Sequence, residues 1–235
     1  MTRTRHRAQR GFSLVELMVS TVIMLVVAGG VFGALNYYQK TYQRTEISAD
    51  MHDNLRSAID LIMQEVGQAG SSPAGATLAS LGVYPAGILT TSTTTSLKLF
   101  GDINGDGTLV YVEYNCNYVT GGAGTLTRSV TPVGTGAVNP ATVLVDNLVP
   151  NPAPDGANCF KYPAAPPAVA GFVFVNQVGV TLTVQTTTMD ALTGNFLSMT
   201  KSALDIVPRN IQMGLDLANA GLLNRLKPTP GPTMP

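Results

Sequence analysis

The chain has 235 residues, of which 12% are charged, and it contains 24 glycines, 15 prolines and no tryptophan. That length accommodates one substantial domain with an extension, and the composition suits a β-rich, loop-rich extracytoplasmic protein better than a cytosolic enzyme. The formal net charge of zero hides an asymmetry, because Arg3, Arg5, Arg7 and Arg10 lie in the first ten residues, which hold no acid. The remainder is acidic, so the chain lacks the basic footprint of a dedicated nucleic-acid binder.

A long apolar segment directly follows this basic leader. Residues 12–35 contain one ionisable side chain, Glu16, and these 24 residues span about 36 Å as a helix, enough to cross a bilayer. A secretory signal peptide has an apolar core of about 7–15 residues and avoids acids, so this run is too long for one. The arginines predict that residues 1–11 are cytoplasmic and that the rest of the chain extends outward. Because a charge at mid-bilayer costs about 3 kcal/mol, Glu16 needs a functional reason.

The sequence around this glutamate resembles the cleavage and methylation signature of type IV prepilins, with Gly11-Phe12-Ser13-Leu14-Val15-Glu16-Leu17-Met18-Val19. The resemblance implies that an inner-membrane prepilin peptidase cuts after Gly11 and N-methylates Phe12. It also implies that Glu16 acts in filament assembly, where its carboxylate would pair with the Phe12 amine of a neighbouring subunit. A buried charge of this kind specifies an arrangement more than it adds stability. The alternative interpretation is an uncleaved signal anchor with a tolerated glutamate near its edge.

The helical pattern continues beyond Leu35 and becomes amphipathic. Apolar residues at spacings of three and four predict one buried face, made of Met51, Leu55, Ala58, Ile59, Ile62, Val66 and Ala69. The other, polar face is predicted to carry Asp53, Arg56, Asp60 and Glu65. Gly67, Gly70 and the following Ser-Ser-Pro end the helix near residue 68. We therefore expect residues 12–35 to be the transmembrane half, and residues 36–69 the amphipathic stalk half, of one helix.

After residue 70 the pattern becomes that of a β-rich head extending to residue 226, followed by a Pro-rich tail, residues 227–235, that we expect to be disordered. Strands are predicted over residues 88–100, 109–114, 171–175, 178–184 and 196–206. The predicted fold class is α+β, with a long N-terminal transmembrane and stalk helix and a β-rich, pilin-like globular head. Behind an export signal, Cys116 and Cys159 are expected to form one disulfide. It closes a loop of about 44 residues, which is worth roughly 4 kcal/mol in the chain-entropy model.

The stalk and head are similar to the PilW type of minor pilin and, more distantly, to the J-type minor pseudopilin of type II secretion. The residues that carry this likeness are Asn54–Leu61, Gln68-Ala69-Gly70, Asp102–Gly107, Val110–Tyr114, Val178–Val184 and Val207–Asn210. The sequence differs from that family at the end of the stalk helix. The family usually has an arginine there, shortly before Ala-Gly, whereas this chain has Val66-Gly67-Gln68.

This likeness implies a low-abundance subunit that primes pilus assembly together with other major and minor pilins. It would wait in the inner membrane with its head in the periplasm, and then enter a pilus at the cell surface. Three alternatives stay open. The first is a minor pseudopilin of type II secretion, and the second is an adhesin or ligand-binding head displayed at the pilus tip. The third is an anchored periplasmic binding protein, which would lack cleavage after Gly11.

One segment of the head fits a calcium-loop pattern in full. Asp102, Asn104, Asp106, Gly107 and Glu113 match D-x-[DN]-x-[DN]-G-x5-E, in which oxygen ligands at alternate positions converge on Ca²⁺. The flanking residues are typical of strands, however, and an extended chain carries Glu113 roughly 16 Å or more past Gly107. Asn-Gly-Asp-Gly is also a good hairpin turn without metal. A calcium site and a plain turn both stay open, and Asp102, Asn104 and Asp106 are the predicted ligands if metal binds.

The sequence offers little support for catalysis. His6 leaves with the leader, so His52 on the stalk helix is the only histidine of the mature chain. The Gly-rich residues 120–124 lack the lysine and following helix of a phosphate-binding loop. We therefore predict that the protein is not an enzyme and needs no cofactor, and that it is instead the substrate of the prepilin peptidase.

Overall fold

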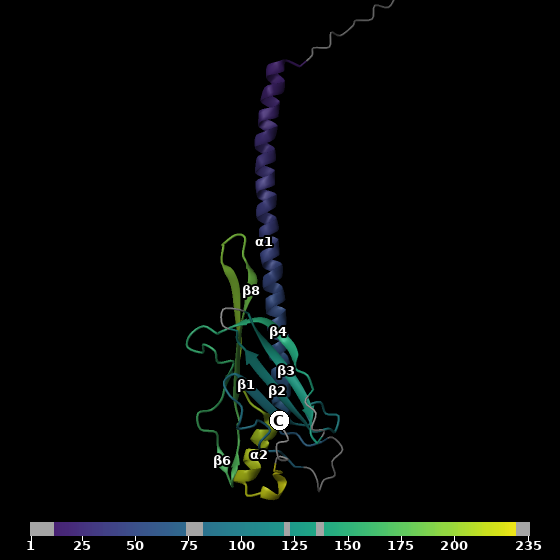
Figure 1. Ribbon diagram of the computed structural model, residues 1–235, viewed down its shortest axis with the longest axis vertical. Coiled ribbons are helices and arrows are strands. Elements are labelled where there is room, and N and C mark those ends of the chain that lie inside the picture. Colours follow the sequence, from purple (N-terminus) through teal and green to yellow (C-terminus); the bar gives the residue numbers. More distant parts are fainter. Residues whose placement is uncertain (1–11, 74–81, 120–122, 135–138, 229–235) are drawn as a thin grey trace, which may run out of the picture. The chain divides into compact units, whose positions relative to one another are not determined.

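The structure, a computed structural model, describes residues 12–73, 82–119, 123–134 and 139–228. The chain divides into two units, Met1–Glu46 and Ile47–Pro235. One helix, α1 (Leu14–Gln68), begins in the first unit and ends in the second (Figure 1). The prediction of a single helix ending near residue 68 is confirmed, and the helix begins two residues later than predicted.

In the first unit, the large apolar side chains between Leu14 and Leu35 are exposed. This part of α1 is long and apolar enough to cross a membrane, and none of its most apolar window is buried inside the protein. Two hydroxyl groups within it bond to the helix itself. Ser20 Oγ donates to the Glu16 carbonyl oxygen at 2.7 Å, and Thr21 Oγ1 donates to that of Met18 at 2.8 Å. These polar groups therefore need no partner outside the helix, as a lipid environment requires.

The second unit is built on a seven-stranded antiparallel sheet with the order β1-β2-β3-β4-β8-β5, and β9 pairs with β8 (Figure 1). A separate two-stranded sheet pairs β6 with β7. A short helix, α2, and a 3-10 turn, η1, follow the last strand. The bounds are β1 Ser96–Gly101, β2 Val110–Asn117, β3 Gly124–Pro132, β4 Thr142–Val149, β5 Phe160–Lys161, β6 Ala168–Val169, β7 Phe172–Val173, β8 Val178–Met189, β9 Phe196–Ile206, α2 Arg209–Asn219 and η1 Leu223–Arg225.

This architecture confirms the α+β prediction, but the predicted strand bounds differ from the observed ones. The strand predicted over residues 88–100 begins only at Ser96, because residues 88–93 fold back along β1, with an isolated bridge between Ile88 and Leu99. The strand predicted over residues 171–175 shortens to Phe172–Val173, whereas that over residues 178–184 extends to Met189. The strand over residues 196–206 is confirmed. β3, β4, β5, β6 and α2 were not predicted from the sequence.

The core of the second unit lies between the C-terminal turns of α1 and one face of the sheet. Leu55, Ile62 and Val66 are fully buried there, in one cluster with strand residues such as Leu97 and Val112. The predicted apolar face of the stalk is therefore confirmed. Because these turns belong to the core of the head, the compact unit begins at Ile47.

A smaller aromatic cluster is also buried in the head. Tyr84, Phe100 and Tyr111 pack together. The ring centroid of Phe100 lies 5.0 Å from that of Tyr84 and 4.9 Å from that of Tyr111.

The C-terminal end of α1 is held by residues distant in sequence. Gly70 has φ +79°, which turns the chain away from the helix, and its amide donates to the Phe100 carbonyl oxygen at 2.8 Å. Asn210, in the first turn of α2, donates its side-chain amide to the carbonyl oxygens of Gln68 and Ala69 at 3.2 and 3.3 Å. α2 thus satisfies carbonyl groups that the end of a helix leaves without an internal partner.

The predicted disulfide is present. Cys116 lies near the end of β2 and Cys159 directly precedes β5, and their sulfur atoms are bonded. The bond joins β2 to the segment that pairs with β8, two parts of the sheet that are not neighbours in the strand order.

Candidate functional site

The candidate processing site lies at the start of α1. Gly11, the residue after which cleavage is predicted, lies outside the described residues, and Phe12 is exposed two residues before the helix begins. The first hydrogen bond of the helix runs from the Leu17 amide to the Ser13 carbonyl oxygen, at 3.1 Å. Glu16 therefore lies in the first helical turn. A carboxylate there interacts favourably with the partial positive charge of the helix N-terminus. The roles of Gly11, Phe12 and Glu16 in cleavage, methylation and assembly stay predictions.

A second polar arrangement, which sequence analysis missed, lies inside the head. Glu65 was predicted on the polar face of the stalk, and that prediction is wrong: its side chain is 5% exposed and faces the sheet. Arg128 on β3 binds it through two hydrogen bonds, one of them from Nε to Oε2 at 3.2 Å, and the Tyr114 hydroxyl on β2 donates to the same carboxylate. Tyr114 and Arg128 are direct cross-strand neighbours, so one register places both opposite the helix. We call these three residues the buried triad.

Burial and charge shape the protonation of the buried triad. Burial, assisted by the negative charge of Glu65, raises the pKa of the Tyr114 hydroxyl far above its ordinary value, so it stays a hydrogen-bond donor. Burial alone would lower the pKa of Arg128, but the hydrogen bonds and charge of Glu65 outweigh it and raise that pKa. The arrangement is therefore a satisfied ion pair with one neutral donor, which suits positioning the sheet on the helix.

The calcium-pattern residues occupy the loop between β1 and β2 and the strand that follows. The Asp102 carboxylate is turned inward and accepts from the Gly107 amide at 3.1 Å, and Asp106 accepts from the Thr108 amide at 2.8 Å. Glu113 lies on β2 and pairs with Lys98 Nζ at 3.5 Å.

This geometry agrees with the hairpin-turn interpretation, because strands flank the loop on both sides. Across the described part of the chain, no three His, Cys, Asp or Glu side chains are grouped as metal ligands. Calcium binding through Asp102, Asn104 and Asp106 stays a prediction.

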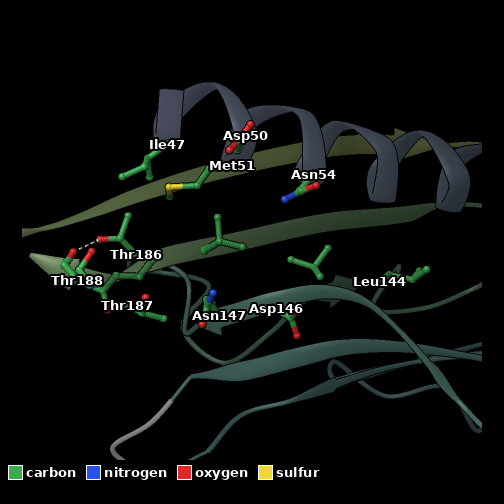
Figure 2. Close-up of a pocket in the computed structure, with 13 residues that line it drawn as sticks. Ile47, Asp50, Met51, Asn54, Leu144, Asp146, Asn147, Thr186, Thr187 and Thr188 are labelled. Carbon is green, nitrogen blue, oxygen red and sulfur yellow. Dashed lines mark hydrogen bonds between the residues drawn. The ribbon is translucent and has the colours of Figure 1, made fainter. Parts of the chain in front are cut away.

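Within the second unit, a polar cavity of about 420 Å³ lies between the Ile47–Asn54 part of α1 and strands β4 and β8 (Figure 2). Met51 and Asn54 point from α1 toward the strands. Asn147 points from the opposite side toward these two helix residues, and it lies at a β-bulge in β4 with a φ of 58°. The ionisable residues that line it are Asp50 and Asp146, both exposed. The lining supplies hydrogen-bond donors and acceptors.

His52 offers no catalytic partner set among the residues described. Its ring nitrogen Nδ1 lies 3.6 Å from the exposed carboxylate of Asp53, on the solvent side of α1. His52 therefore lies on a solvent-exposed face of the helix.

Comparison with known proteins assigns the N-terminal segment. Residues 6–32 match the family model described as the prokaryotic N-terminal methylation motif. No curated protein and no solved structure gives a significant match to the chain. The matched residues comprise the end of the basic leader, the predicted cleavage site, Glu16 and most of the exposed apolar part of α1. This motif, at the start of a helix able to span a membrane, indicates a prepilin peptidase substrate of the type IV pilin or pseudopilin kind.

Proposed function

We propose that the protein is a structural, non-catalytic minor pilin of a type IV pilus, cleaved after Gly11 and N-methylated at Phe12. The observation that carries this proposal is the methylation motif over residues 6–32, continuous with an apolar helix surface that the protein itself leaves exposed. Residues 12–35 act as the transmembrane segment before assembly and as the packing surface inside the filament. Residues 36–69 are the stalk, and the head is presented in the periplasm and then on the pilus.

The proposed mechanism of assembly depends on Glu16. Cleavage creates a new amine on Phe12, and methylation keeps its positive charge. In a filament core, where water is scarce, the Glu16 carboxylate of one subunit pairs with the Phe12 amine of its neighbour. An unpaired charge in that environment is costly, so extraction from the membrane is favourable mainly in the register that forms the pair.

Replacement of Glu16 tests this mechanism. Glu16→Ala should leave cleavage and methylation intact and reduce incorporation into filaments, because the pairing partner of the Phe12 amine is lost. Ser20→Ala, one turn further along the same helix, is the matched control and should be incorporated normally. Equal incorporation of Glu16→Ala and the Ser20→Ala control into sheared filaments would exclude the pairing mechanism.

The minor-pilin role is supported by the form of the head and by its likeness to the PilW type. A seven-stranded sheet with long connecting loops makes a large head for a subunit repeated along a thin fibre. Such a head suits a subunit of low copy number that helps a tip complex prime assembly with other pilins.

A gene deletion tests which machine the subunit serves. The deletion strain is scored for sheared surface pili and for secreted protein in the same cultures. Loss of pili with secretion intact is the expected result. Normal pili with secretion lost would assign the protein to the type II secretion pseudopilus instead. If both survive, an assembly role is excluded, and a binding function of the head becomes the alternative.

A further inference from the structure

Three exposed tyrosines directly follow the apolar run of α1. Tyr37, Tyr38 and Tyr42 are 60%, 69% and 72% exposed, and the described residues of the first unit, 12–46, include no buried side chain against which they could pack. The apolar run ends at Leu35, and the first charged residue after Glu16 is Lys40. The tyrosines therefore lie where the helix changes from uniformly apolar to polar.

We propose that these tyrosines form a membrane-interface anchor, in which their rings lie among the lipid headgroups of the outer leaflet of the inner membrane. The inference rests on the membrane-spanning role proposed above and adds the partner that this part of the helix contacts. Tyrosine suits the site, because its ring is apolar and its hydroxyl can reach water or a headgroup.

The geometry of the helix places all three rings at that depth. At 1.5 Å per residue, Tyr37 lies about 3 Å and Tyr42 about 10 Å beyond Leu35 along the helix axis. Helical side chains lean toward the N-terminus, so each ring covers the turn before its own residue and lies closer to the membrane than its backbone does. The headgroup region is about 5–7 Å thick on each side of the hydrocarbon, so Tyr37 and Tyr38 lie within it, and Tyr42 reaches its outer edge because its ring leans back toward the membrane.

The surface between the rings is more apolar than the sequence indicates. Thr41 Oγ1 donates to the Tyr37 carbonyl oxygen at 2.9 Å, and Thr45 Oγ1 donates to that of Thr41 at 3.0 Å. Both hydroxyls are thus used by the helix backbone, and both threonines line a shallow groove with Tyr38 and Tyr42, which are four residues apart on one face. Tyr37 contacts Tyr38 edge to face, with ring centroids 6.2 Å apart, and extends the aromatic surface around the helix.

The anchor has a consequence for the mature subunit. Before processing, the four leader arginines hold the cytoplasmic end of the span. Cleavage after Gly11 removes all of them, and the tyrosines then become the main feature that fixes how deeply the helix sits. They therefore set the depth at which Phe12 and Glu16 wait before assembly.

Single tryptophans test this depth, because the natural chain contains none. The full chain is reconstituted in phosphatidylcholine–phosphatidylglycerol vesicles whose lipids carry bromine at a shallow or a deep acyl position. Tyr38→Trp is compared with Leu25→Trp in the middle of the span and with Ile47→Trp beyond it; all three native side chains are exposed. We expect deep bromine to quench Leu25→Trp best, shallow bromine to quench Tyr38→Trp best, and neither to quench Ile47→Trp.

A second measurement tests the anchor itself. Adding Tyr37→Ser, Tyr38→Ser and Tyr42→Ser to Leu25→Trp should change the ratio of deep to shallow quenching, because the helix loses its fixed depth. Ala49→Ser, about two turns beyond Tyr42 and outside the groove, is the control and should leave the ratio unchanged. An unchanged ratio in the serine variant would overturn the anchor and leave a protein partner as the role of the tyrosines, since no partner is present in the vesicles. If Leu25→Trp is not quenched at all, the membrane-spanning role has failed instead.

Discussion

Replacing Arg128 with methionine should strongly destabilise the head. The substitution removes both hydrogen bonds to Glu65 and leaves its carboxylate, 5% exposed, with the Tyr114 hydroxyl as the remaining partner from the buried triad. Breaking a buried ion pair from one side costs about 3–5 kcal/mol. Because the Arg128 side chain is itself 20% exposed, we expect a value near the lower end, about 3 kcal/mol.

Urea unfolding of the full chain in mild detergent, followed by near-ultraviolet circular dichroism of its tyrosines, measures this change. With a denaturant slope of about 2 kcal/mol per molar, the midpoint should fall by about 1.5 M. Arg56→Met is the matched control, because Arg56 and Asp60 form a 3.5 Å pair whose side chains are 67% and 62% exposed. An exposed pair of this kind is worth at most about 0.5 kcal/mol.

A triple variant shows whether Arg128→Met destabilises the head through the unpaired charge that it leaves buried or through loss of packing. Glu65→Met, Arg128→Met and Tyr114→Phe together remove every polar group of the buried triad while keeping similar volume. Stability should then return to within about 1 kcal/mol of the natural chain, because no polar group is left buried without a partner. The reasoning is refuted if Arg128→Met costs no more than Arg56→Met, or if the triple variant is as unstable as Arg128→Met alone.

Three further changes test the head by the same unfolding assay. Replacing both Cys116 and Cys159 with serine should lower the free energy of unfolding by about 4 kcal/mol, because the bond closes a loop with a sequence separation of 43; a loss under about 1 kcal/mol would contradict this. Gly70→Ala should destabilise by at least about 1–2 kcal/mol, since φ is +79° and the new Cβ would meet a backbone carbonyl oxygen at 2.7 Å; an unchanged midpoint would show that the turn relaxes. Burial raises the pKa of the Tyr114 and Tyr162 hydroxyls above the ordinary value of 10.0. The protonated hydroxyls therefore stabilise the folded state fully below pH 10. This stabilisation is lost progressively above pH 10, by up to about 1.4 kcal/mol per pH unit for each tyrosine. The midpoint should therefore fall above pH 10, and tyrosinate absorbance from these two should rise only with unfolding; free titration of every tyrosine near pH 10 in the folded protein would contradict it.

The N-terminal helix could be predicted from the sequence because its signals are local. The apolar run, the amphipathic spacing after it and the glycines near residue 68 each act within a few residues, and α1 ends at Gln68 as they indicate. The same local pattern misled for Glu65. At about 100° per residue, Glu65 lies only about 20° from Ala58 on the helix, at the edge of the apolar face. That angular position was the available signal, but its partners Tyr114 and Arg128 come from strands far along the chain.

The missed elements of the head have a similar physical cause. β3 has three threonines among its nine residues, and both β3 and β4 are largely half exposed or exposed, so their burial alternates irregularly. Their pairing also depends on neighbours that the sequence does not reveal. α2 did carry a pattern, because Ile211, Leu215 and Ala218 are buried on one face and Pro208 precedes the helix. Because α2 has only eleven residues, its apolar pattern repeats too few times to be distinguished from a loop.

Mass spectrometry of the mature N-terminus shows directly whether prepilin peptidase processes this chain. The protein is isolated from the membranes of cells that carry a prepilin peptidase, and its N-terminal peptide is sequenced. We expect a chain that begins with N-methylated Phe12, with residues 1–11 absent. A chain that still begins at Met1, or that is cut at a position other than Gly11, would contradict it.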